Sequence, residues 1–159
     1  MPGTRCDDGS MGTIAYEDLT PGRVFDLGEV KVDRAEMLAF AERFDPQPFH
    51  LDEEAGRNSV LGGLCASGWF TASLWMRGYV DNVVADSTSQ GSPGGNELAW
   101  LAPVFPDDVL RLKMEVNSQR RSQSKPNLGL VEITGTADRD YERVLRFTFV
   151  AMFGTRDQT

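Results

Sequence analysis

The second half of the chain alternates between apolar and polar side chains with a period of two, which is the pattern of a β-strand. In residues 109–117 the apolar positions are 110, 112, 114 and 116, and charged side chains stand between them. Residues 130–138 and 144–153 predict two further strands, the last with apolar side chains at 145, 147, 149, 151 and 153. Strands with one apolar side are typical of an antiparallel sheet that packs on a single face.

Residues 24–32 and 97–104 predict additional strands, so we expect a sheet of four or five strands. Gly28 stands where the alternation of the first strand changes side, which predicts a β-bulge at that position.

Two helices are predicted between these strands. The first begins after Asp33, a residue type that caps helices, with Glu36 three residues further on. Its apolar stripe consists of Met37, Phe40, Ala41 and Phe44. The second helix, over 64–80, is apolar on nearly every side, so we expect it to be buried. Gly68 lies in its first turn, where tight helix–sheet packing or the close approach of another group accounts for a glycine.

A buried helix needs apolar surface around it, and one-faced strands need something to pack on. The α+β arrangement that meets both needs is a curved antiparallel β-sheet wrapped around a long central helix, the hot-dog fold. A flatter sheet in an α+β sandwich is the alternative. One such unit leaves its edge strands open, so we expect a homodimer or a higher even homo-oligomer.

Charge and composition narrow the class of protein. The 159 residues carry a formal net charge of −8, which argues against nucleic acid or an anionic membrane as a partner. No run reaches the roughly 18 apolar residues that a membrane-spanning helix needs. Residues 1–12 lack the apolar run of a signal peptide and predict a disordered N-terminal extension, which leaves a single domain over 13–156.

Cysteine and histidine are scarce. Two cysteines, Cys6 and Cys65, are too few for a disulfide framework, so we expect a cytoplasmic protein. With a single histidine they also form no plausible zinc site, and we expect no metal.

The candidate chemistry lies in residues 44–50, which read FDPQPFH and contain the one histidine, His50. Pro46 and Pro48 restrict the backbone between Asp45 and His50, so we expect a stiff, non-helical loop. Because histidine side chains titrate near neutral pH and carboxyl groups well below it, the pair suits general acid–base catalysis. The alternative is a proline-rich connector in which His50 only hydrogen-bonds a carbonyl group.

The run from 44 to 77 resembles the MaoC-like dehydratases and the (R)-specific enoyl-CoA hydratases. Their motif is an aspartate, two intervening positions, a proline, an apolar residue and a histidine. Asp45, Pro48, Phe49 and His50 match it, and Gly68 stands where the family has a glycine eighteen residues past the histidine. Residues 98–104, LAWLAPV, resemble the strand that follows. The resemblance covers about 16–153.

Three positions depart from the family pattern. Gln47 replaces the usual asparagine, Ser67 stands where histidine is common, and Asp107 replaces a turn glycine.

The resemblance implies a hydro-lyase that adds water to, or removes it from, a trans-2-enoyl-CoA. Asp45 would act as the base, His50 would deliver a proton to the α-carbon, and the Gly68 N–H would stabilise the thioester oxygen. No cofactor is implied, because coenzyme A enters as part of the acyl-CoA substrate. A hot-dog acyl-CoA thioesterase and a non-catalytic dimer that binds acyl thioesters are the two alternatives.

The expected substrate contacts surround this motif. Phe49, Trp69 and Phe70 flank the catalytic positions and are expected at the acyl end, with core packing as the competing role of Trp69. The other expected substrate-binding residues are Gln47, Ser67, Arg120 and Arg121. The two arginines belong to a basic hairpin tip that could hold coenzyme A phosphates, and simple solvation of that tip is the competing interpretation.

Overall fold

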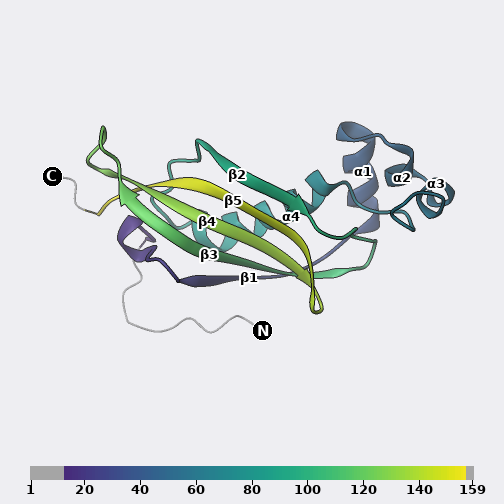
Figure 1. The fold of residues 1–159 in the computed structure, drawn as a ribbon, viewed down its shortest axis with the longest axis horizontal. Coiled ribbons are helices and arrows are strands. Elements are labelled where there is room, and N and C mark those ends of the chain that lie inside the picture. The colour runs from purple at the N-terminus through teal and green to yellow at the C-terminus, as the bar shows by residue number, and fades with distance from the viewer. Residues whose placement is uncertain (1–12, 157–159) are drawn as a thin grey trace.

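Five antiparallel strands form one sheet in the order β1-β3-β4-β5-β2 (Figure 1). The computed structural model describes residues 13–156. The strands are β1 (Val24–Lys31), β2 (Gly94–Trp100), β3 (Val109–Arg121), β4 (Leu128–Arg139) and β5 (Glu142–Gly154). The predicted alternation of β3 is confirmed, because the apolar side chains at 110, 112, 114 and 116 are at most 2% exposed. This strand runs four residues further than predicted, since its end pairs with β4 in a long hairpin.

The bulge predicted at Gly28 is confirmed. The register between β1 and β3 shifts between Asp26 and Gly28, where the glycine adopts a φ of +88°. Asp107, in the turn before β3, also has a positive φ, of 71°. Aspartate tolerates this left-handed conformation better than most residues, which accounts for its place where the family has glycine.

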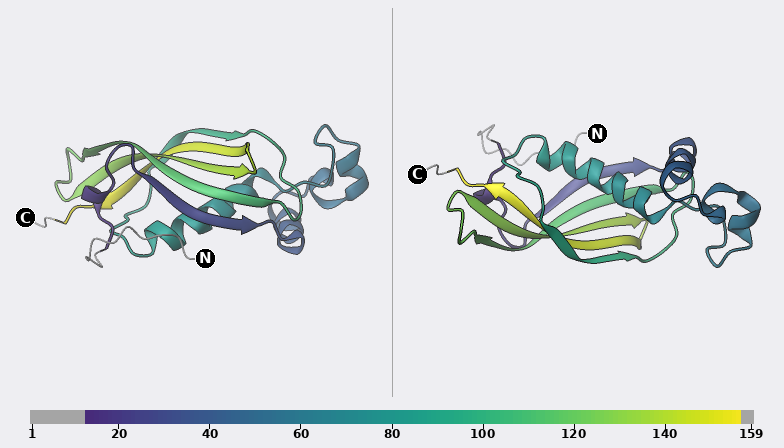
Figure 2. Two further views of the ribbon diagram at one scale, coloured as in Figure 1. Left: turned by 90° about the horizontal axis from the view of Figure 1, so that it is seen from below. Right: turned by 90° about the horizontal axis from the view of Figure 1, so that it is seen from above.

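The helix α4 (Gly68–Tyr79) lies along the concave face of the sheet, as the two views of Figure 2 show. Its Trp75 is fully buried and meets Phe147 of β5 edge-on, with ring centroids 4.6 Å apart. Gly135 of β4 makes room for this indole, because a Cβ there would lie 2.7 Å from it. A curved antiparallel sheet around one central helix is the hot-dog fold that the sequence predicts.

The start of α4 differs from the prediction, which placed it at 64. Residues 64–67 are not helical, and the helix begins at Gly68 because the Ser67 hydroxyl caps it by accepting a hydrogen bond from Trp69 N at 3.3 Å. At the other end it continues into η2 (Val80–Val84), one turn of π-helix.

The burial of α4 is one-sided, whereas the sequence predicts burial on nearly every side. Phe70, Thr71, Trp75 and Tyr79 face the sheet and are buried. Trp69, Met76 and Val80 on the other side are 57%, 46% and 36% exposed. An apolar helix face is therefore left open to solvent in the single chain.

Three short helices form one end of the molecule (Figure 1). They are α1 (Arg34–Phe44), α2 (Pro48–Leu51) and α3 (Glu53–Arg57). Asp33 caps α1 through a bond from Glu36 N, as predicted. Phe44 does not join the buried stripe of that helix, since it is 62% exposed; its ring contacts only Phe40 and the Arg43 guanidinium among the described residues.

Strand β2 is an open edge of the sheet. It pairs with β5 on one side and with no strand of residues 13–156 on the other. The opposite edge, β1, lies against α4, and Asn82 of η2 donates to the Leu27 carbonyl there. The segment 85–93 before β2 is fastened by backbone hydrogen bonds to Ile14, Met152 and Gly154. The disordered extension predicted for 1–12 lies outside the described residues.

Candidate active site

Asp45 and His50 are placed by the way the chain leaves α1. Asp45 is the C-cap of this helix, its N–H bonded to Ala41 O at 2.9 Å, and Pro46 prevents a further turn. The sequence predicts a non-helical loop as far as His50, but His50 lies in the single turn α2. Pro48 is the first residue of that turn, a position for which its fixed φ is suited.

The His50 ring is held from behind by a backbone carbonyl. The side chain is buried, and its Nδ1 lies 2.8 Å from the carbonyl oxygen of Cys65. A carbonyl oxygen can only accept, so Nδ1 carries a hydrogen and Nε2 is the atom left for chemistry. The alternative interpretation, a proline-rich connector, predicts a hydrogen bond from His50 to a carbonyl group. The bond is present, but it uses only one of the two ring nitrogens.

The Asp45 carboxylate is held from three directions. Gln47 Nε2 donates to Oδ1 at 2.6 Å, the Ser67 hydroxyl donates to Oδ2 at 2.7 Å, and His50 Nε2 lies 3.3 Å from Oδ2. Burial on its own favours the neutral acid, but the hydrogen bonds from Gln47 and Ser67 and the charge of His50 outweigh it. Together they lower the pKa of Asp45 below its usual value.

The geometry of this pair gives it one transferable proton. With Nδ1–H fixed on Cys65 O, the contact between Nε2 and the carboxylate is attractive when Nε2 also carries a proton. The pair then consists of an imidazolium that can give a proton and a carboxylate that can accept one. Both side chains line the same cavity, so a single small molecule can meet both groups.

The N-terminus of α4 supplies a hydrogen-bond donor close by. Trp69 N bonds to the Ser67 hydroxyl, and the N–H groups of Phe70 and Thr71 bond to the Ser67 carbonyl. The Gly68 N–H is the first-turn donor left without a partner within residues 13–156. It lies at the positive end of the helix dipole and therefore suits a developing negative charge.

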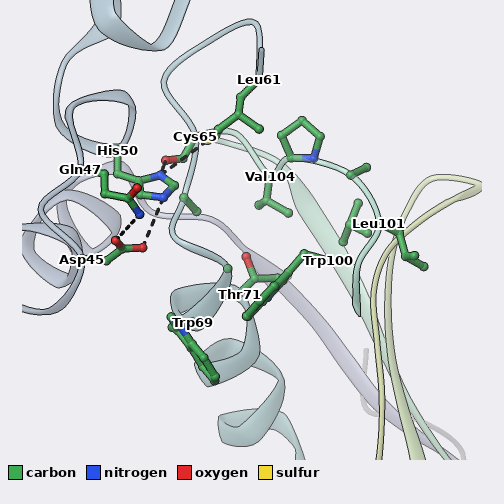
Figure 3. Close-up of a pocket in the computed structure, with 15 residues that line it drawn as sticks. Asp45, Gln47, His50, Leu61, Cys65, Trp69, Thr71, Trp100, Leu101 and Val104 are labelled. Carbon is green, nitrogen blue, oxygen red and sulfur yellow. Dashed lines mark hydrogen bonds and ion pairs between the residues drawn. The ribbon is translucent and has the colours of Figure 1, made fainter. Parts of the chain in front are cut away.

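These groups surround a cavity of about 490 Å³ (Figure 3). Its polar groups sit on one wall, where Figure 3 shows Asp45 and Gln47 beside His50. The remaining wall is mostly apolar and consists of Leu61, Cys65, Ala66, Trp69, Thr71, Trp100, Leu101, Ala102, Pro103, Val104 and Val144.

Sequence reasoning did not assign Trp100 and its neighbours to the site, although residues 98–104 were noted as a family-like strand. A useful signal is the apolar run that continues from Trp100, where β2 ends, into Leu101 and Ala102.

Five of the expected substrate contacts lie at this end of the molecule, but not all of them face the cavity. Phe70 is buried and does not line it. Gln47 and Trp69 line it. Ser67 is fully buried and its hydroxyl is committed to Asp45, so it positions the carboxylate and does not line the cavity. Phe49 packs edge-on against His50 at 4.6 Å between ring centroids and also does not line the cavity.

Arg120 and Arg121 lie at the other end of the sheet. They end β3, whose thirteen residues span about 40 Å and whose first residue, Val109, pairs with Lys31 just before α1. Arg121 bonds to Pro126 O at 3.5 Å and approaches Glu17 at 3.7 Å. The expectation that these arginines join the site is therefore wrong within one chain, because the strand that carries them leads away from it.

Residues 13–156 contain no group of three histidine, cysteine, aspartate or glutamate side chains placed to hold a metal ion. In the same residues, no helix has both the length and the apolar character required to cross a membrane.

Comparison with known proteins finds the same architecture. The profile of the family described as "MaoC like domain" matches residues 17–137. The uncharacterized protein YdeM of Bacillus subtilis (strain 168) is 30% identical over 126 residues, which cover 76% of this chain and 84% of YdeM.

Two solved structures are also similar. The MaoC-like dehydratase from Rhodospirillum rubrum is 36% identical, with a TM-score of 0.80 over 91% of this chain and 99% of that one. The R-hydratase PhaJ1 from Pseudomonas aeruginosa, at 17% identity, shares the fold with a TM-score of 0.70 over 91% of this chain and 88% of its own.

Proposed function

The chain belongs to the MaoC-like domain family, and from this premise we propose that it is a hydro-lyase acting on a trans-2-enoyl-CoA. It adds water across the double bond to give an (R)-3-hydroxyacyl-CoA, or removes that water in reverse. The observation that carries this proposal is the contact of 3.3 Å between His50 Nε2 and Asp45 Oδ2 in the wall of the cavity, with the histidine tautomer fixed by Cys65 O.

The two groups divide the proton transfers of hydration between them. Asp45 accepts a proton from the attacking water, whose oxygen bonds to the β-carbon of the enoyl group. His50 gives its Nε2 proton to the α-carbon, so both new bonds form on one side of the double bond. Afterwards Asp45 carries the water proton and passes it across the 3.3 Å contact to His50, which restores the starting state.

The thioester oxygen gains negative charge when water adds. The Gly68 N–H, at the positive end of α4 and without a partner in the described chain, is the donor for that oxygen. Loss of one such donor typically slows an enzyme by about 100-fold or more. No cofactor enters the proposal, because the thioester itself activates the double bond and coenzyme A arrives with the substrate.

The surroundings of Cys65 favour hydration over thioester cleavage by a cysteine. The thiol Sγ lies 3.6 Å from His50 Nδ1, which resembles a cysteine–histidine pair. However, burial and then the nearby charge of Asp45 raise the pKa of this thiol, so it stays protonated and a poor nucleophile. The Nδ1 hydrogen is also directed to a carbonyl oxygen, which leaves no base for the thiol.

We propose that the working form is a homodimer or a higher even homo-oligomer that pairs through β2. This strand has an unpaired edge, and Leu98 and Trp100 on it are 37% and 43% exposed. The exposed apolar face of α4 borders it. A second copy would pair with this edge, which the single chain leaves open.

The test of the proposed reaction is hydration of crotonyl-CoA, followed by loss of the enoyl absorbance. Asp45→Asn and His50→Gln should each lower kcat by about 100-fold to 10,000-fold, because each removes one proton transfer. The double variant should be little slower than the worse single variant, since the two groups act as a unit. A parallel free-thiol assay should show no release of coenzyme A.

The matched control is Asp52→Asn. Asp52 caps α3 two residues beyond His50, and its carboxylate does not line the cavity. Full activity in folded Asp45→Asn or His50→Gln would refute the catalytic pair. Release of free thiol would point to the thioesterase, and binding without turnover across short and medium enoyl-CoAs would point to the binding dimer.

A further inference from the structure

A second hollow, of about 440 Å³, lies beside the catalytic cavity along the open face of α4. Its walls include Ala72 and Met76 of α4, Leu98 of β2 and the rings of Phe147 and Phe149 on β5. Glu97 at its rim is paired with Arg146 at 2.8 Å, so the hollow presents mainly apolar surface. Trp69 lines both hollows, which makes them neighbours.

Two tryptophans meet where the hollows adjoin: Trp69 lines both, and Trp100 lines the catalytic cavity on its side of Trp69. The rings of Trp69 and Trp100 meet edge-to-face, with centroids 5.1 Å apart (Figure 3). Trp100 and Leu98 lie two residues apart on β2 and so point to the same side of the sheet. Leu98 lines the second hollow and Trp100 lines the catalytic cavity. An acyl chain that extends from the cavity along this side of β2 therefore meets Trp100 before it reaches Leu98.

The Trp100 ring packs against Gly68 at this boundary. A Cβ on residue 68 would lie 2.4 Å from both Nε1 and Cε2 of the indole, far closer than atoms in contact. The glycine that offers its N–H to the thioester oxygen is thus also the position against which Trp100 packs. The indole consequently stands within a few ångströms of where the acyl group begins.

We infer that Trp100 sets the acyl-chain length that the site accepts, by closing the catalytic cavity off from the second hollow. The inference rests on the proposed function, because it takes the Gly68 N–H as the anchor of the thioester. With the indole in place the acyl group ends at the tryptophan pair, so the unmodified protein takes short enoyl groups. Without the indole the second hollow becomes the continuation of the acyl site.

The experiment measures kcat/KM for trans-2-enoyl-CoAs of four, six, eight and ten carbons. The unmodified protein should prefer four carbons to eight. In Trp100→Ala the value for eight carbons should rise on the order of 100-fold, since each of four additional CH₂ groups buried contributes about fourfold. Trp100→Phe keeps a ring at the boundary and should keep the preference for short chains.

Two further variants separate the boundary from a general loosening of the site. Leu101→Ala shortens a side chain of the cavity that lies apart from Trp69 in Figure 3, and it should not move the length preference. Trp100→Ala combined with Ala72→Leu places a larger side chain in the second hollow, so the gain for eight carbons should be lost. If Trp100→Ala does not fold, Trp100→Leu carries the same test.

Calorimetric binding of butyryl-CoA and octanoyl-CoA keeps this inference separate from the reaction. If no variant hydrates an enoyl-CoA but Trp100→Ala gains affinity for octanoyl-CoA, the proposed reaction fails and the role of Trp100 stands. An unmodified protein that already takes eight carbons as well as four overturns the inference. So does a Trp100→Ala variant with an unchanged length profile, which would assign the second hollow to a second copy of the chain. If no variant binds either acyl-CoA, both proposals are wrong.

Discussion

Removal of the Ser67 hydroxyl is the most informative single perturbation of the site. This hydroxyl donates to Asp45 Oδ2 at 2.7 Å and accepts from Trp69 N at 3.3 Å, so it ties the catalytic carboxylate to the first turn of α4. In Ser67→Ala both bonds are lost and no charge changes. We expect a folded protein with a misplaced carboxylate, which makes Ser67 a positioning residue.

The size of the effect follows from these two bonds. Loss of a helix cap costs about 1 kcal/mol, and a hydrogen bond to a charged group contributes about 1.5–3 kcal/mol. The Asp45 side chain is 18% exposed and can turn toward water, so the second contribution belongs at the low end. A total of about 2.5 kcal/mol corresponds to a fall in Tm of about 5–10 °C for a chain of this length. Misplacement of a reacting group by about 1 Å costs up to 100-fold in rate, and we expect kcat/KM to fall by about 10-fold to 100-fold.

The pH dependence distinguishes positioning from capping. Asp45 must be ionised to accept a proton, so activity is lost as the pH falls through its pKa. The Ser67 bond helps to lower that pKa, and its removal raises the pKa, which moves the acid limb of kcat/KM to higher pH. Folding stability depends on pH in the same direction as activity. Because the pKa of Asp45 is lower in the folded chain, its ionised carboxylate stabilises the fold at pH values above its ordinary pKa of 3.8. That stabilisation is lost as the pH falls through the lowered pKa.

The assay is crotonyl-CoA hydration from pH 2.5 to 7, a range that includes the acid limb of the unmodified protein below pH 3.8, together with thermal unfolding. Asp33→Ala is the matched control, since it removes the cap of α1 without touching Asp45. Ser67→Thr keeps a hydroxyl and should restore most of the pH profile. If Ser67→Ala loses only stability, and its acid limb coincides with those of the unmodified protein and of Asp33→Ala, Ser67 is a helix cap and nothing more.

Two other predictions concern the rest of the molecule. Leu98→Glu places a charge on the open edge of β2, and light scattering should show monomers where the unmodified protein forms dimers; an unmodified protein that is already monomeric at micromolar concentration would refute pairing through this edge. Gly56→Ala places a Cβ 2.4 Å from Leu64 N and 2.5 Å from Gly63 C, and backbone atoms cannot swing aside. It should cost about 1–3 kcal/mol of stability and lower activity per folded molecule, because residues 63–67 carry the partners of His50 and Asp45. Gly63→Ala, whose Cβ meets only the Phe105 ring at 3.1 Å, should be milder in both measurements, and equal effects would contradict this account.

The elements that the sequence predicts well depend on neighbours only a few residues apart. The alternation in β3 and β5 is a property of each strand, and it correctly predicts which side is buried. The cap of α1 involves Asp33 and the N–H of Glu36, three residues further along. The fold follows from these local patterns together with one strongly apolar helix.

Local patterns were less reliable where a single hydroxyl or a proline decides the boundary. The apolar run from 64 to 80 contains no signal for a start at Gly68, because the cap depends on how the Ser67 side chain is turned. The proline-rich segment predicts a loop, yet Pro48 begins a helical turn that carries His50. In the first case only the start of the predicted helix is misplaced, whereas in the second the helical turn itself is missed.

By itself, the sequence determined the sheet, the central helix and the pair Asp45 and His50, because these depend on local periodicity and on one short motif. Only the tertiary structure decided what surrounds that pair. The bond from His50 to Cys65 O joins residues 15 apart and the bond from Ser67 to Asp45 joins residues 22 apart. Trp100 reaches Gly68 through the curvature of the sheet, and Arg121 is carried away by the length of β3. Contacts at such separations depend on how a curved sheet and a helix pack in three dimensions, which no pattern of neighbouring residues encodes.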